Sequence, residues 1–342
     1  MWLRNQPNAA SLVDAGSIDA MPRAVLLTGM TGFVGSHLAE RLLAAGIEVH
    51  GLVMEEPPYP HLAGIEDRVR VHRGELGDID ALRSAIEAAA PAVVVHLAGQ
   101  AVPTLAAADP LGAVRVNVMG TATVLAAIAE YPEVRLVAAS SSEVYGDPDH
   151  LPVGEHAPLR PTNVYAASKV AAEAILAEHG RRGVNPVTIL RPANQNGPRQ
   201  HPRLAASEWA RQIAEAEAGA GDLVIRHGDL RARRDFVDVR DMADAFARAA
   251  QLTEPGAVPY NVGTGRAVSM QDVLDLLVGF ARVPVRTEVD PSRVRSGTPS
   301  IVSLDTSRFR AATGWQPRIG LAQSLADLLE YWRASSRVGA AT

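Results

Sequence analysis

Residues 24–35 read AVLLTGMTGFVG, in which a short apolar run leads directly into three glycines spaced three residues apart. The run has the length and composition of a buried strand, and the apolar residues that follow lie on one face of a helix that Gly46 ends. Glycines between a strand and a helix permit a tight turn and let backbone N–H groups approach a pyrophosphate at the helix N-terminus. We therefore expect a dinucleotide-binding turn rather than a purely structural one. Its predicted contacts are Gly29, Thr31, Gly32, Phe33, Val34 and Gly35.

The same alternation of strand and helix continues to about residue 190. Further strands are expected at 47–53, 69–71, 92–97, 134–139 and 187–190, with helices near 78–90, 111–130 and 163–180. This order predicts an α/β fold, a Rossmann-type doubly wound parallel sheet with helices on both faces.

After residue 190 the periodic pattern breaks into the shorter pieces 204–217, 240–252, 269–280 and 321–333. We expect a flexible leader at 1–21 and a dinucleotide-binding domain at 22–190. A smaller C-terminal α/β region that binds the substrate is expected at 191–335, interleaved with the first domain.

Composition excludes several classes of function. The chain is 47% hydrophobic and 21% charged, which is typical of a globular protein. Its net charge of -5 disfavours nucleic acid and membrane surfaces as partners. The absence of cysteine excludes disulfides, thiolate metal sites and cysteine nucleophiles, and the ten histidines show no metal-ligand spacing with acids. We expect no metal site, no membrane span and no signal peptide, which makes a cytoplasmic protein the default.

Tyr165 and Lys169 are four residues apart on a predicted helix, so both side chains lie on one face. A nearby ammonium favours the phenolate and should lower the pKa of the tyrosine, so that the phenol works as an acid or a base near neutral pH. Lys169 is the single lysine among 33 basic residues, which argues against an incidental surface pair.

A second candidate group is the run Ser140–Glu143, which follows the strand at 134–139. It lies at the edge of the sheet where ligands bind in open α/β folds, and a serine hydroxyl there can donate to a substrate carbonyl. The alternative is an ordinary polar end of a strand.

The tip of the strand at 47–53 should select between NAD and NADP. Met54 stands there, Glu55 and Glu56 follow it, and no arginine is near in sequence, so NAD or NADP stays open.

Several motifs together resemble the extended short-chain dehydrogenase/reductase family, the epimerases, dehydratases and reductases that modify nucleotide sugars. They are HLAG at 96–99, NVMGT at 117–121, Ser141 placed 24 residues before Tyr165, RPAN at 191–194 before Gly197, RDFVDV at 234–239 and YNVGTG at 260–265. The resemblance implies that Tyr165 protonates the C4 oxygen of a sugar, that Ser141 hydrogen-bonds this oxygen, and that Lys169 holds the nicotinamide ribose. Glu143 occupies the place of the base that dehydratases use.

The resemblance also implies a set of binding residues. Those for the cofactor, besides the glycine turn and the Tyr165–Lys169 pair, are Met54, Glu75, Leu76, Leu97, Ala98, Gly99, Asn117, Ser140, Arg191 and Pro192. Those for the nucleotide sugar are Gln100, Ser142, Asn194, Arg234 and Arg295.

Within this family, the segments at 233–241 and 287–319 are most similar to reductases of GDP-4-keto-6-deoxy-D-mannose, close to the GDP-mannose 4,6-dehydratases. The reaction this implies is NAD(P)-dependent reduction of the C4 ketone of an NDP-4-keto-6-deoxyhexose, giving GDP-D-rhamnose. The alternative is a 4,6-dehydratase or 4-epimerase with tightly bound NAD(P). A GDP-sugar is favoured, but residues 293–298 lack the glutamate of that branch, so TDP and UDP sugars stay open.

The family resemblance further implies a homodimer. Its interface would be a four-helix bundle formed by the Ala-rich helices near 113–130 and 163–180 and their copies. The alternative is that both helices are buried within one chain.

Overall fold

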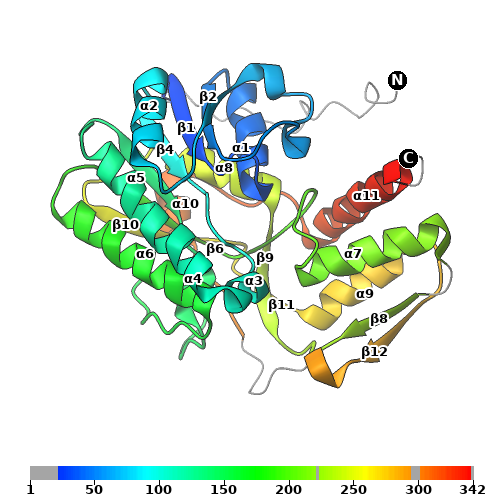
Figure 1. Ribbon diagram of the computed structural model, residues 1–342. Helices are drawn as coiled ribbons and strands as arrows, with labels where there is room; N and C mark the ends of the chain where they lie inside the picture. The colour runs from blue at the N-terminus through cyan, green and yellow to red at the C-terminus, as the bar shows by residue number, and fades with distance from the viewer. Residues whose placement is uncertain (1–21, 221–222, 294–300, 340–342) are drawn as a thin grey trace.

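The computed structural model describes residues 22–220, 223–293 and 301–339 (Figure 1). The predicted leader at 1–21 lies outside the described residues. The main sheet has seven parallel strands in the order β10-β6-β5-β4-β1-β2-β3. They are β1 (Ala24–Thr28), β2 (Glu48–Val53), β3 (Val69–Arg73), β4 (Val93–His96), β5 (Arg135–Ala139), β6 (Val187–Pro192) and β10 (Ala257–Val262). The predicted Rossmann-type sheet is confirmed.

Helices cover both faces of this sheet (Figure 1). Val25 and Leu27 of β1 join one buried cluster with α1 (Phe33–Ala44), α8 (Val239–Ala249) and α10 (Ser307–Thr313). Leu26 points the other way, into a second cluster with α2 (Ile79–Ala89), α5 (Gly120–Ile128) and α6 (Val164–Arg181). Successive side chains of a strand point to opposite faces, so each central strand contributes to both layers.

A smaller region lies beside the carboxyl ends of the strands (Figure 1). Its core contains Trp209, Leu274 and Leu328, which come from three packed helices. These helices are α7 (Ala205–Glu215), α9 (Met270–Phe280) and α11 (Leu321–Gly339). Its strands are β7 (Asn194–Asn196), β9 (Arg233–Asp238) and β11 (Ala267–Ser269) in one sheet, and β8 (Leu223–His227) with β12 (Val285–Val289) in another.

The chain crosses between the two regions several times after residue 190. β10 completes the main sheet beside β6, and α8 packs on α1, although both follow segments of the smaller region. The sequence pattern did not indicate β10, because its exposed neighbours and Pro259 obscure a strand that pairs only with β6.

The predicted helix at 111–130 forms as three joined pieces. They are α4 (Pro110–Val114), the π-helical turn η4 (Arg115–Met119) and α5, preceded by the short α3 (Pro103–Ala108). Contrary to the sequence expectation, the helical stretch Pro110–Ile128 is long and apolar enough to cross a membrane. That is weak evidence for a membrane span, because core helices of globular proteins pass the same test and this one packs on α2 and α6.

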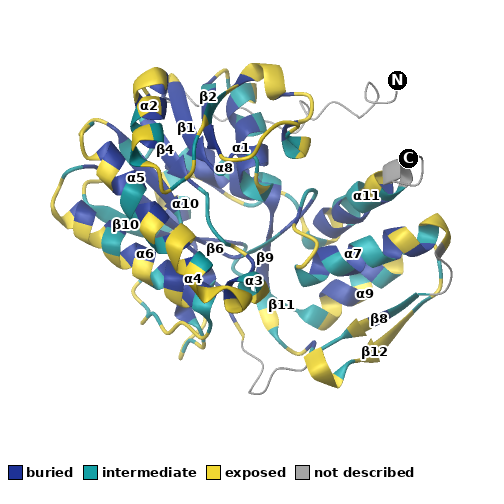
Figure 2. Cartoon of the chain, viewed as in Figure 1, coloured by how far each residue is buried: buried dark blue, intermediate teal, exposed yellow. Residues whose placement is uncertain are grey.

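The remaining described elements are short helical turns. They are η2 (Pro60–Leu62), η3 (Glu66–Arg68), η5 (Ser142–Tyr145), η6 (Ala216–Ala220) and η7 (Pro291–Arg293). Figure 2 shows the buried strands of the main sheet between helices whose outer sides are exposed.

Candidate active site

A cavity of about 810 Å³ opens at the carboxyl ends of the main strands, between the sheet and the smaller region. Its walls come from the turns after β1 to β6, from α6 and from the start of α7. The strand order reverses at β1, with β2 and β3 on one side and β4 to β6 on the other. Open α/β sheets bind ligands at this switch point.

The glycine turn lies at the cavity floor and leaves no room for side chains. Gly29 has a φ of +76°, and a Cβ there would be 2.7 Å from the backbone nitrogen of Ala98. A Cβ on Gly35 would be 2.0 Å from the carbonyl oxygen of Gly29. Phe33, Val34 and Gly35 open α1 at the cavity wall, so the helix N-terminus faces the space where a pyrophosphate would bind. This turn fits a dinucleotide cofactor.

The ends of β2 and β3 form the side of the cavity where the adenosine is expected. Met54, Glu75 and Leu76 all line it. Glu55 accepts a hydrogen bond of 3.3 Å from the Thr31 hydroxyl.

The structure also brings an arginine near the tip of β2, which the sequence did not reveal. Arg73 ends β3, and its Nη2 lies 2.5 Å from Oε1 of Glu56. The parallel pairing of β2 with β3 creates this contact across 17 residues of sequence.

Ser141, Glu143, Tyr165 and Lys169 all line the cavity, so the structure brings the four predicted catalytic side chains together. Asn163 organises this group from the N-cap of α6. Its Oδ1 accepts from the backbone N–H of Ala166 at 2.8 Å, and its Nδ2 donates to Oε2 of Glu143 at 2.8 Å. A side-chain hydrogen bond joins Tyr165 to Ser141.

The electrostatics of Tyr165 differ from the sequence expectation. Burial raises the pKa of the phenol, and the negative charge of Glu143 adds to this effect, while the hydrogen bond with Ser141 opposes it. The prediction that Lys169 lowers this pKa is wrong for the chain on its own. The ammonium is not aimed at the phenol, since Nζ donates to the carbonyl oxygen of Ala139 at 2.8 Å.

Burial also lowers the pKa of Lys169 to about 8, although Glu173 counteracts the shift. Lys169 is therefore protonated at neutral pH but close to losing its charge, and Tyr165 holds its proton.

Three other predicted cofactor residues, Leu97, Ala98 and Gly99, line the cavity after β4. A Cβ on Gly99 would be 2.8 Å from Oδ1 of Asn117 and 3.4 Å from Nζ of Lys169. This glycine lets the loop after β4 approach the catalytic lysine.

Asn117 is buried behind the cavity wall and does not line the cavity. Its Oδ1 accepts from the backbone N–H of Gln100 at 2.8 Å, and its Nδ2 donates to the carbonyl of Gln100 at 3.1 Å and to the hydroxyl of Ser168 at 2.8 Å. It joins the loop after β4 to the residue before Lys169, which suits a supporting role.

Ser140, Ser142, Pro192 and Asn194 line the cavity, but Gln100, Arg191 and Arg234 do not. Arg191 is buried in an ion pair with Glu173 at 2.6 Å, and Ser140 also donates to Glu173. The guanidinium of Arg191 is fully engaged in these contacts below the cavity. The structure therefore does not support a direct contact between this side chain and the cofactor. Arg295 lies outside the described residues.

Gln100 and Arg234 face other groups. The Gln100 side chain accepts from the backbone N–H of Val102 at 3.1 Å, and Arg234 donates to the carbonyl of Arg233 at 3.0 Å. Neither side chain lines the cavity, so the structure does not support the predicted contacts with the substrate. These contacts stay predictions.

Several cavity residues on the substrate side were not predicted from the sequence. Gln195, Asn196 and Gln200 follow Asn194, and the apolar residues Leu204, Phe236 and Met270 complete this wall. The string NQNGPRQ at 194–200 could have signalled the polar ones, because it directly follows a strand end. Phe236 lies within the RDFVDV motif at 234–239, which did not indicate that this side chain faces the cavity, and Met270 had no local signal.

Comparisons with known proteins agree with this geometry. Residues 26–328 match the family model described as GDP-mannose 4,6 dehydratase. The chain belongs to this family. GDP-6-deoxy-D-mannose reductase of Pseudomonas aeruginosa is 33% identical, over 93% of this chain and 99% of the relative. UDP-glucose 4-epimerase of Mycolicibacterium smegmatis is 35% identical, over 91% of this chain and 99% of the relative.

Solved structures of the same fold carry nicotinamide cofactors. RMD from Pseudomonas aeruginosa in complex with NADPH aligns with a TM-score of 0.79 and 30% identity, covering 92% of this chain and 99% of that one. UDP-glucose 4-epimerase of Thermus thermophilus in complex with NAD aligns with a TM-score of 0.79 and 30% identity, covering 91% and 99%. Like these members of the dehydratase and epimerase families, the chain is an NAD(P)-dependent nucleotide-sugar oxidoreductase.

Proposed function

We propose that the chain reduces the C4 ketone of an NDP-4-keto-6-deoxyhexose, with GDP-4-keto-6-deoxy-D-mannose as substrate and GDP-D-rhamnose as product. The observation that carries the proposal is the pair of hydroxyls of Ser141 and Tyr165 on one cavity wall, with Tyr165 protonated at neutral pH. Reduction needs a proton donor at the C4 oxygen. Dehydration and epimerisation begin instead with removal of a proton from a C4 hydroxyl, for which the tyrosine must first be in its phenolate form.

The roles of the residues follow from their positions. A bound reduced nicotinamide supplies the hydride that C4 accepts. Tyr165 gives its proton to the C4 oxygen, so that the ketone becomes a hydroxyl, and Ser141 donates a hydrogen bond to the same oxygen as negative charge develops on it. Lys169 binds the cofactor ribose. The glycine turn and α1 hold the pyrophosphate.

The nature of the relatives adds support. One curated relative, 33% identical, is a GDP-6-deoxy-D-mannose reductase, and the chain spans nearly all of it. The same comparison supports a GDP-sugar over TDP and UDP sugars, and the solved structures with NADPH and NAD support either NADPH or NADH as reductant.

A second candidate is a 4-epimerase or 4,6-dehydratase that retains NAD(P). The epimerase from M. smegmatis is slightly more similar in sequence, and Glu143 lines the cavity with its carboxylate oriented by Asn163. A carboxylate beside the catalytic tyrosine is the group that proton removal from a sugar carbon requires.

The test is a direct assay of turnover. Purified protein is incubated with GDP-4-keto-6-deoxy-D-mannose and NADPH or NADH, and nicotinamide absorbance and sugar products are followed. We expect loss of reduced cofactor and formation of a GDP-6-deoxyhexose. No oxidation of either cofactor, together with conversion of UDP-glucose to UDP-galactose or loss of water from GDP-mannose, would establish the second candidate instead.

Glu143→Gln separates the two candidates further. Reduction should keep most of its rate in this variant, whereas dehydration should be abolished. Mass spectrometry of small molecules released from the purified protein adds a check, since copurified NAD(P)⁺ is expected only of an enzyme that recycles its cofactor.

The proposal includes a homodimer in the cytoplasm. Leu111 of α4 is 77% exposed and Val114 of the same helix is 43% exposed, and neither lines the cavity. Ala167, Ala171 and Ala174 form an exposed stripe on the neighbouring α6. Apolar faces of two adjacent helices suit a four-helix bundle with a second copy.

A further inference from the structure

The segment Asn194–Gln200, here called the wall segment, has some residues that line the cavity and others that face the neighbouring helices. Asn194, Gln195, Asn196 and Gln200 line the cavity, whereas Gly197, Pro198 and Arg199 do not. The three excluded residues face α1 and α8 instead. A Cβ on Gly197 would be 2.7 Å from Cγ1 of Val239, so the segment lies close against the start of α8.

Arg199 joins the wall segment to α1. Its Nη2 donates to Oε1 of Glu40 at 2.5 Å, and its Nη1 donates to the hydroxyl of Ser36 at 3.2 Å. Its backbone has a φ of +71°, a left-handed conformation that L residues other than glycine rarely adopt. Such a conformation persists where the surrounding contacts over-determine it, and it occurs often at ligand clamps.

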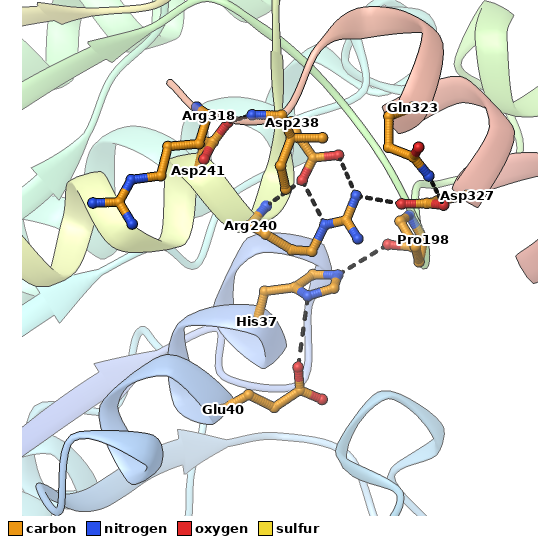
Figure 3. A network of polar contacts seen from close by, with 10 residues as sticks. His37, Glu40, Pro198, Asp238, Arg240, Asp241, Arg318, Gln323 and Asp327 are labelled. Carbon is orange, nitrogen blue, oxygen red and sulfur yellow. Dashed lines mark hydrogen bonds and ion pairs between the residues drawn. The ribbon is translucent and has the colours of Figure 1, made fainter. Parts of the chain in front are cut away.

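His37 provides a second contact between α1 and this segment. Its Nε2 donates to the carbonyl oxygen of Pro198 at 3.1 Å, and its Nδ1 lies 3.7 Å from Oε2 of Glu40 (Figure 3). Figure 3 also shows Arg240 between Asp238 and Asp327, which joins α8 to α11 next to this contact. The wall segment is thus held where α1, α8 and α11 meet.

The contacts of Arg199 and His37 between α1 and the wall segment connect the two halves of the active site. The first residues of α1, Phe33 to Gly35, line the cofactor side of the cavity. The wall segment lines the substrate side and is braced internally, since Nε2 of Gln200 donates to the carbonyl of Gln195 at 2.6 Å. A shift of Arg199 would therefore move the polar wall relative to the cofactor-binding helix.

We propose that Arg199 is a positioning residue, which holds the polar wall of the substrate site at a fixed distance from the cofactor-binding helix through Glu40 and Ser36. The inference rests on the proposed function in one respect, namely that a nucleotide sugar contacts the wall segment. Arg199 itself does not touch the substrate. Its loss should weaken substrate binding and leave cofactor binding unchanged, because the glycine turn keeps its own support from β1 and Ala98.

The test compares Arg199→Ala, Arg199→Lys and Glu40→Gln with Arg41→Ala. Arg41 is a matched control, since it lies on the same helix and pairs with Asp244 of α8 at 2.9 Å without contacting the wall segment. KM and kcat are measured with GDP-4-keto-6-deoxy-D-mannose, NADPH affinity by fluorescence, and Tm by thermal unfolding.

We expect Arg199→Ala to raise the KM for the sugar about tenfold, with kcat lowered less than about threefold and NADPH affinity within about twofold of wild type. Glu40→Gln should change KM in the same direction. Arg199→Lys should restore part of the affinity, because an ammonium can still reach Glu40. An unchanged KM in Arg199→Ala, or an equal rise in Arg41→Ala, would overturn the proposal, as would a loss of NADPH affinity parallel to that of the sugar.

Failure of the proposed function is distinguishable from failure of this inference. Wild-type turnover of the keto sugar decides the function. If the wild type acts on UDP-glucose instead, the same KM ratios are measured with UDP-glucose. The comparison of KM between Arg199→Ala and Arg41→Ala then decides whether Arg199 has the positioning role.

Discussion

At the scale of single residues, the active site depends on how burial and hydrogen bonds distribute charge. Tyr165 and Lys169 are both buried, and burial disfavours the charged form of each. The phenol consequently keeps its proton, and the lysine comes close to losing its own. Glu173 is paired with Arg191 and also accepts a hydrogen bond from Ser140, so its negative charge is compensated within the buried network.

Tyr165→Phe tests the role of the phenol as acid. Removal of the hydroxyl should lower kcat for ketone reduction about 10²- to 10⁴-fold, the usual contribution of general acid catalysis. NADPH affinity, measured by fluorescence, should stay near wild type. Tyr131→Phe is the control, since that hydroxyl contacts Glu87 on the surface. A Tyr165→Phe enzyme with wild-type kcat would contradict the assignment.

Lys169 predicts a pH dependence of cofactor binding. Its pKa is lowered to about 8, so the ammonium is present below that pH and is lost above it. NADPH affinity should therefore fall as the pH rises through about 8. Titrations of NADPH between neutral and alkaline pH check this, and Lys169→Arg, which stays charged, should remove the decline. A flat profile in the wild type would show that the ammonium does not bind the cofactor.

At the scale of elements, short local features set the geometry of the site. Asn163 caps α6 and orients Glu143, while Asn117 joins the loop after β4 to Ser168 from the π-helical turn η4. π-helical turns occur often at functional sites, and here the turn places an amide behind the cavity wall. The glycine turn after β1 is the third such feature.

Gly35→Ala should abolish most cofactor binding. A methyl group there would meet the Gly29 carbonyl at 2.0 Å, so the turn must move away from the start of α1. We expect NADPH affinity to fall at least about tenfold by fluorescence titration, as the pyrophosphate loses its backbone donors.

Gly77→Ala is the matched control for this substitution. Gly77 also lines the cavity, but a Cβ there meets nothing within 4 Å. Its NADPH affinity and Tm should equal those of the wild type. Equal loss of affinity in both variants would mean that the close packing of the glycine turn is not the cause.

At the scale of the whole molecule, the main sheet and the smaller region enclose the cavity together. The chain returns to the main sheet with β10 and α8 after it has built part of the smaller region. The exposed apolar side chains Leu111 and Val114 of α4 do not line the cavity, and they lie on the face that we assign to a second copy. Burying a side chain such as Leu111 contributes about 2 kcal/mol.

The proposed dimer predicts a mass twice that of the chain in sedimentation experiments. Leu111→Glu combined with Ala171→Glu should shift it to the monomer, because each substitution places a charge in the apolar interface. Val289→Glu is the control, since Val289 is 64% exposed on β12 of the smaller region, far in sequence from these helices. A monomeric wild type would refute the bundle.

The sequence by itself determined the features that neighbouring residues encode. The strand and helix periods, the glycine turn and the spacing of Tyr165 and Lys169 depend on a few adjacent positions, so they predicted the sheet and most of the cavity floor. Tertiary structure alone decided the rest. It paired β3 with β2 and so placed Arg73 beside Glu56, it buried Arg191 against Glu173, and it brought Phe236 and Met270 to the substrate side. It also reversed the expected pKa of Tyr165, because desolvation depends on atoms from distant segments that no local pattern reveals.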